Sequence, residues 1–130
     1  MTSSTPPPSP AGLVLEAEDT KLVVLARAAR LRAYTPAGQR AEGAAVRDTD
    51  GRTYAAATVA HTRPELATSA LRAAVVAAAS SGARRFEAVA VVTDSAEIGA
   101  DDLAVLAEFG AGVPVFLAGP DGVARDRVSS

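Results

Sequence analysis

The chain has 130 residues, a length typical of one domain with a single core. Apolar residues make up 48% of the chain but aromatic residues only 4%, so Ala, Val and Leu must build the core, and oligomerisation would bury further surface. A net charge of −2 with scattered arginines argues against a nucleic-acid surface. The absence of cysteine excludes disulfides, a thiolate zinc site and a thiol nucleophile.

The first residues of the sequence do not predict a secretory signal. Residues 1–12 have neither a basic start nor an apolar run, and no apolar stretch approaches the roughly 20 residues that span a bilayer. We therefore expect a cytoplasmic protein without membrane contact. The Pro/Ser/Thr-rich residues 1–13 predict a flexible tail, with a linker or docking segment as the alternative. The domain is expected at 14–122, followed by a polar, frayed tail at 123–130.

The first half of the chain predicts a helix and then a hairpin. Asp19 or Thr20 can cap a helix in which apolar residues recur at spacings of three and four, and Pro36 ends it. Two short strands are expected at 43–47 and 53–59. An Asp-Gly pair between them favours a tight turn, because glycine accepts the positive φ that such a turn needs.

The second half predicts helices alternating with strands. Pro64 suits the first turn of a small-sided helix that runs to about Ser81 and stops at Gly82. The remaining expected elements are a strand, a helix and a strand, at residues 86–93, 101–109 and 113–117. A hairpin followed by such alternation implies a mixed sheet with helices on both faces.

Short motifs along the chain occur in the order of a known family. They are AYTP at 33–36 with GAAV at 43–46, DGRTY at 50–54, RRFEAVAV at 84–91 and VLAEF at 105–109. Together these stretches resemble the small homotetrameric cytidine deaminases, in register across roughly residues 20–120. The resemblance implies a three-layer α/β/α domain with a mixed five-stranded sheet. It also implies a homo-oligomer, most plausibly a tetramer.

In that family, three cysteine thiolates hold a zinc ion that lowers the pKa of a bound water, and a glutamate shuttles protons. The register places Ser69, Gly99 and Asp102 at the ligand positions and Leu71 at the glutamate position. A hydroxyl is a poor zinc ligand at neutral pH, glycine has no side chain, and one carboxylate does not make a metal site. Leucine carries no proton, so we expect neither a catalytic residue nor a metal here.

The positions that hold the nucleoside in the family have also changed. Arg40 stands at an aromatic position, and Thr58 and Ala60 stand at the Asn and Glu that bind the ribose. The sequence thus predicts a cytidine deaminase-like protein without activity or cofactor, serving as an oligomeric scaffold or as a module that binds a protein partner or a small molecule. The alternative is a hydrolytic deaminase of cytidine, deoxycytidine or a related nucleoside with a rebuilt site, which would then need zinc.

Other candidates have an ordinary structural explanation beside the functional one. The single histidine, His61, is in a loop and is expected to be solvated. Ser69 has no His and Asp partners at a recognisable spacing for a nucleophile. The pair Arg84-Arg85 fits a solvated strand entry better than an anion site. Acids near the third helix suit its N-terminus better than they suit Mg²⁺ or Ca²⁺: Asp94, Glu97, Asp101 and Asp102.

Overall fold

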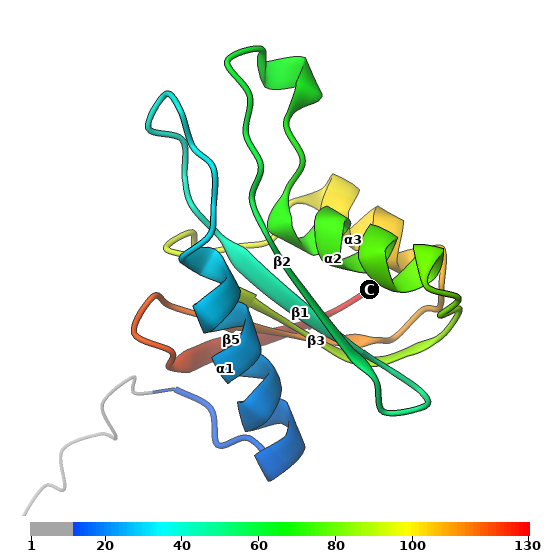
Figure 1. Ribbon diagram of the computed structural model, residues 1–130. Helices are drawn as coiled ribbons and strands as arrows, with labels where there is room; N and C mark the ends of the chain where they lie inside the picture. Colours follow the sequence, from blue (N-terminus) through cyan, green and yellow to red (C-terminus); the bar gives the residue numbers. More distant parts are fainter. Residues whose placement is uncertain (1–11) are drawn as a thin grey trace, which may run out of the picture.

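A five-stranded mixed sheet forms the middle layer of the protein (Figure 1). The structure, a computed structural model, describes residues 12–130. The strands are β1 Gly43–Asp48, β2 Thr53–Ala57, β3 Phe86–Val92, β4 Pro114–Ala118 and β5 Ala124–Ser129. Their order across the sheet is β2-β1-β3-β4-β5, in which β3 and β4 run parallel and every other neighbouring pair runs antiparallel.

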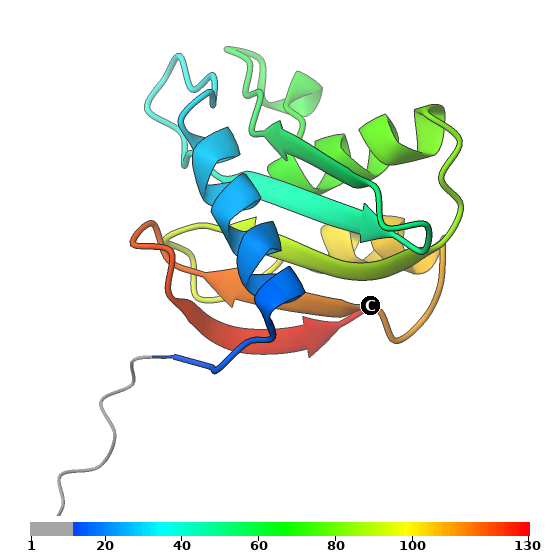
Figure 2. The ribbon, with the colours of Figure 1, turned by 60° about the horizontal axis from the view of Figure 1, so that its bottom comes forward.

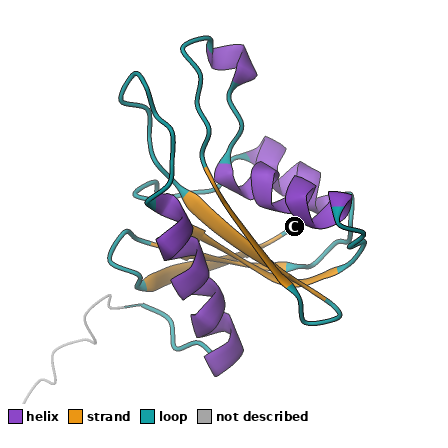
Figure 3. Cartoon of the chain, in the orientation of Figure 1, coloured by secondary structure: helices purple, strands orange, loops and turns teal. Residues whose placement is uncertain are grey.

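Helices cover both faces of this sheet, which confirms the predicted three-layer α/β/α architecture. Helix α1, Ala17–Arg30, crosses one face, and helices α2, Ala70–Ser80, and α3, Ala100–Ala107, cover the other (Figures 2 and 3). Two separate apolar clusters fill the two interlayer spaces. None of the helices within residues 12–130 combines the length and the apolar character needed to cross a bilayer.

Strand β3 contributes side chains to both apolar clusters, because successive side chains of a strand point to opposite faces of the sheet. Val89 and Val91 pack against α2 and α3, whereas Ala88 and Ala90 pack beneath α1. The small residues under α1 let the helix approach the sheet closely. At Gly43, a Cβ atom would lie only 2.0 Å from the carbonyl oxygen of Ala26 in α1, so this position has no room for a side chain.

Two predicted helix starts are wrong. Helix α1 begins at Ala17 with Glu16 at its N-cap position, ahead of the Asp19 or Thr20 cap. Pro64 begins only a short 3₁₀ turn, Pro64–Leu66, and α2 starts later, at Ala70. The reason for the late start is that Thr68 pairs its backbone with Val59, which holds the preceding loop extended until Ser69 caps α2.

The expected polar tail at 123–130 is also wrong over most of its length, because residues 124–129 form β5 along the edge of the sheet. The strand is mostly exposed, so its charged side chains stay in water while its backbone pairs with β4. At the other end of the chain, the predicted flexible tail at 1–13 lies almost entirely outside the described residues. Within the described part, the Leu13 N–H donates to the Ala124 carbonyl at 2.8 Å.

Candidate functional site

The first turns of α2 and α3 lie near each other beyond the carboxyl end of β3 (Figure 1). A hydrogen bond joins Ser69 and Asp102 there. The Ser69 hydroxyl donates to Asp102 Oδ1 at 2.8 Å. The same oxygen of Ser69 accepts the backbone N–H of Arg72 at 3.2 Å and so caps α2. Arg72 Nη2 lies 3.7 Å from Asp102 Oδ1 and completes the group. Gly99 occupies the N-cap position of α3 and contributes no side chain.

Leu71 points into the core behind these polar groups. It is 2% exposed and belongs to the apolar cluster shared by α2, α3 and the sheet. It also lines a cavity of about 30 Å³ together with Val91, Ile98 and Asp102. A cavity of that size has room for about two water molecules at most. Leu71 therefore separates the apolar core from the polar side chains of Ser69, Arg72 and Asp102 at the helix starts.

Glu42 and Thr93 line the same cavity, and the sequence alone did not single them out. The Thr93 hydroxyl donates to a Glu42 carboxylate oxygen, and Arg125 donates to the Thr93 carbonyl at 3.3 Å. The register between β1 and β3 would have identified them. Gly43 pairs with Val92, so Glu42, before β1, and Thr93, after β3, lie side by side at the ends of these strands. Their hydrogen bond ties the start of β1 to the end of β3.

The residues at the predicted nucleoside positions make contacts within the fold. Arg40 pairs with Asp94 at 2.7 Å on an exposed surface. Thr58 is buried, and its hydroxyl exchanges hydrogen bonds with the backbone N–H and carbonyl of Glu42. Ala60 is also buried. Through these contacts Thr58 and Ala60 serve as packing and positioning residues of the loop that leads to α2.

Of the other sequence candidates, Glu97 lines the small cavity together with Asp102, whereas His61 and Arg84 form their hydrogen bonds elsewhere. His61 is exposed, and no imidazole nitrogen is a hydrogen-bond partner of Ser69 in the described part of the chain. Arg84 donates to the carbonyls of Ala79 and Ala83, which satisfies the C-terminal end of α2. Asp101 is exposed in the first turn of α3, where its charge complements the helix dipole.

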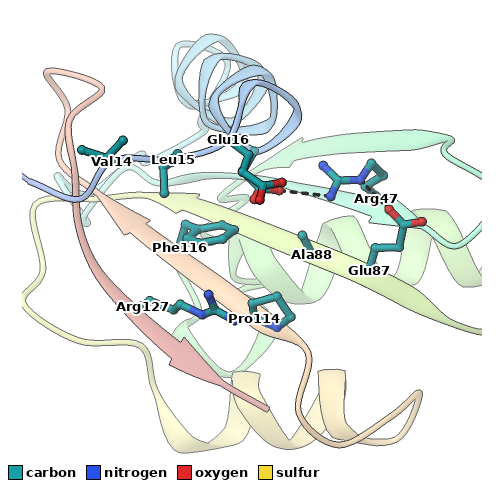
Figure 4. Close-up of a pocket in the computed structure, with 10 residues that line it drawn as sticks. Val14, Leu15, Glu16, Arg47, Glu87, Ala88, Pro114, Phe116 and Arg127 are labelled. Atoms are coloured by element: carbon teal, nitrogen blue, oxygen red, sulfur yellow. Dashed lines mark hydrogen bonds and ion pairs between the residues drawn. The ribbon is translucent and has the colours of Figure 1, made fainter.

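A second hollow, of about 280 Å³, lies on the opposite face of the sheet, beside the start of α1 (Figure 4). Arg47 bonds Asp19 and Glu87 at its rim, and the Arg127 guanidinium lies 5.7 Å from the centre of the Phe116 ring. Burial by itself lowers the pKa of Arg47, but the hydrogen bonds and charges of Glu87 and Asp19 outweigh it and raise that pKa. Arg47 is thus paired with both carboxylates, and Glu16 and Arg127 are further charged groups that line the hollow.

The layers, the strand order and the two helix starts at the carboxyl end of β3 define a deaminase-type α/β/α domain. The family model described as "Cytidine deaminase-like" matches residues 15–122, and the chain belongs to that family. A search among curated proteins gives no match.

Solved structures of cytidine deaminases are similar to this chain. The enzyme from Burkholderia pseudomallei is 29% identical with a TM-score of 0.77, over 84% of this chain and 90% of that one. The enzyme from Mycobacterium tuberculosis is 27% identical with a TM-score of 0.71, over 85% of this chain and 90% of that one. The enzyme from Mycobacterium leprae shares the fold at 24% identity and a TM-score of 0.73, over 88% and 94%.

The donor atoms at Ser69, Gly99 and Asp102, where the resemblance implies metal ligands, do not fit zinc. Catalytic zinc takes three protein ligands from His, Cys or carboxylate side chains and leaves one position open. Here the donors are one hydroxyl and one carboxylate, and they already bond each other at 2.8 Å. Within residues 12–130, no three His, Cys, Asp or Glu side chains are grouped so as to hold a metal ion. No chemical step can therefore be assigned to a metal at these residues.

Proposed function

We propose that this chain is a non-catalytic member of the cytidine deaminase-like family, acting as an oligomeric scaffold or as a module that binds a protein partner or a small molecule. The observation that carries the proposal is the burial of Leu71 in the core at 2% exposure. Hydrolytic deamination needs a group there that takes a proton from water and delivers it to the base and to the leaving ammonia. A leucine side chain has no titratable proton, and it faces a cavity of only about 30 Å³.

Two further features support the same proposal. The Ser69 hydroxyl donates its one hydrogen bond to Asp102, and Asp102 is paired with Arg72. Ser69 therefore cannot donate its O–H elsewhere without breaking that arrangement. Arg40, Thr58 and Ala60 replace the family's nucleoside contacts, and each is engaged or buried within the chain. We expect a homo-oligomer, most plausibly a tetramer, in the cytoplasm.

A second candidate is a hydrolytic deaminase of cytidine, deoxycytidine or a related nucleoside. Its support is the 29% identity to the Burkholderia pseudomallei cytidine deaminase over 90% of that chain. Such an activity would need a metal and a proton carrier drawn from other residues, such as Glu42 or Asp102 in the small cavity. Sequence identity at this level is compatible with either candidate, because similarity of fold does not fix chemistry.

Metal analysis combined with a turnover assay separates the two candidates. Purified protein is expected to contain far less than one zinc per chain and to leave cytidine and deoxycytidine unchanged by ultraviolet absorbance. Zinc at one per chain, together with turnover that a chelator abolishes, would support the deaminase and overturn the proposal. The oligomeric state is measured separately by light scattering coupled to gel filtration, where a tetramer is expected and a monomer would contradict the scaffold.

A further inference from the structure

The start of helix α3 is held by both apolar and polar contacts, since Ile98 and Leu103 are partly buried against the core cluster. Leu106, near its C-terminal end, is its only fully buried residue. The N-cap residue, Gly99, provides no side-chain cap for the first turn. Asp102 is the residue of that turn whose side chain bonds another element, through Ser69 and Arg72 of α2. A polar contact therefore ties the α3 start to α2 in addition to the apolar packing.

We propose that Ser69, Arg72 and Asp102 form a polar clasp that joins the starts of α2 and α3 in place of a metal ion. At the corresponding family positions the resemblance implies metal ligands, whereas the donors here do not fit zinc. The clasp links the same two helix starts by a hydrogen bond of 2.8 Å and an ion pair of 3.7 Å. It follows that this fold is held together without metal, and that zinc does not govern its stability.

The charges around the clasp favour its formation. Asp102 stands in the first turn of α3, where the helix dipole stabilises a negative charge. Its side chain is 19% exposed, so its hydrogen bond from Ser69 is partly shielded from water. Arg72 adds a compensating positive charge, although its side chain is 41% exposed. Hydrogen bonds to a charged group are about twice as strong as neutral ones.

Ser69 serves both helices at once. As acceptor it caps α2 through the Arg72 N–H, and as donor it holds Asp102 of α3. A hydroxyl has one donor and two acceptor positions, so the two bonds do not compete. Removal of the hydroxyl should therefore loosen both helix starts, whereas removal of the Asp102 carboxylate should loosen α3 selectively.

A matched pair of substitutions tests the clasp. Asp102→Ala and Asp101→Ala each remove one acid from the first turn of α3, but only Asp102 bonds α2. The equilibrium constant for folding, measured by urea titration, is expected to fall about tenfold more for Asp102→Ala than for Asp101→Ala. Asp102→Asn keeps an acceptor for Ser69 without the charge, so its folding constant should lie between those of Asp102→Ala and Asp101→Ala. Equal effects of the two alanine variants would overturn the proposal.

The independence from metal is tested on the wild-type protein. The thermal midpoint is expected to be the same with EDTA as with added zinc sulfate, and a lower midpoint in EDTA would overturn the proposal. A double-mutant cycle with Ser69→Ala and Asp102→Ala should show a non-additive effect on the free energy of unfolding. That non-additive part measures the bond between Ser69 and Asp102, apart from the capping of α2 by Ser69. Additive effects would contradict a direct link between the helices. The folding constants and thermal midpoints do not depend on turnover. Deaminase activity would therefore overturn the proposed function, whereas the clasp would still be judged by the stability measurements.

Discussion

Replacing Leu71 by alanine is expected to lower stability in the way that a core substitution does. Leu71 is 2% exposed and contacts the cluster between α2, α3 and the sheet, so truncation removes almost its whole apolar side chain from that packing. Leu→Ala changes in cores cost about 2–5 kcal/mol, because lost burial and the cavity left behind add together. The adjoining cavity of about 30 Å³ would grow rather than collapse.

From these terms we expect the free energy of unfolding to fall by about 3 kcal/mol and the thermal midpoint by about 10 °C. Urea titration followed by circular dichroism measures the first, and differential scanning calorimetry measures the second. The matched control is Leu66→Ala, in the 3₁₀ turn Pro64–Leu66, where the side chain is 48% exposed. The control should change stability by about 0.5 kcal/mol or less.

The reasoning would be refuted if Leu71→Ala and Leu66→Ala had the same effect within the error of the titration. That outcome would mean that Leu71 borders an open site rather than the core. A rise in stability with Leu71→Ala would contradict the reasoning more strongly, because it would reveal strain at this position. Either result would contradict the assignment of Leu71 to the packed core.

The remaining predictions concern other parts of the fold. Arg47→Met, which breaks a pair with Asp19 at a side chain that is 14% exposed, should lower the free energy of unfolding by about 2 kcal/mol in urea titrations. Arg40→Met, at an exposed pair, should lower it by about 0.5 kcal/mol at most. Gly43→Ala should cost about 3 kcal/mol or prevent soluble expression, because its Cβ would lie 2.0 Å from a helix carbonyl oxygen. Gly99→Ala has no atom within 4 Å of the added Cβ and should be tolerated in the same assay.

Much of the fold follows from local patterns. The Asp-Gly turn predicts the β1–β2 hairpin, and the apolar run FEAVAVV predicts the buried strand β3. Strand β5 could not be predicted in this way. Its sequence, ARDRVS, has few apolar residues to alternate, because the strand lies at the edge of the sheet with most side chains in water.

The start of α2 shows why boundaries are harder to predict than elements. Proline at the first turn is a valid local signal at Pro64, and it does begin a short 3₁₀ turn. The backbone pairing of Thr68 with Val59 is a contact between segments, and it delays the helix until Ser69. Local propensity does not contain that information.

The resemblance placed Ser69, Gly99 and Asp102 at the family's ligand positions and Leu71 at its glutamate position. The structure brings Ser69 and Asp102 into direct contact, and the sequence did not predict that bond. A hydrogen bond between two residues separated by 33 positions depends on how two helices cross the same sheet, which no local pattern encodes. The contact of Glu42 with Thr93 depends instead on the register between β1 and β3, two strands that are distant in the sequence.

Deamination of cytidine and deoxycytidine by the purified protein tests the central claim most directly. The assay follows ultraviolet absorbance at high protein concentration with added zinc, beside an active cytidine deaminase as positive control. Enzymes commonly turn over about 10 times per second, so an activity about a thousandfold lower would still be seen within hours. We predict no turnover above the buffer blank. Zinc-dependent conversion of either nucleoside, lost on addition of a chelator, would contradict the account.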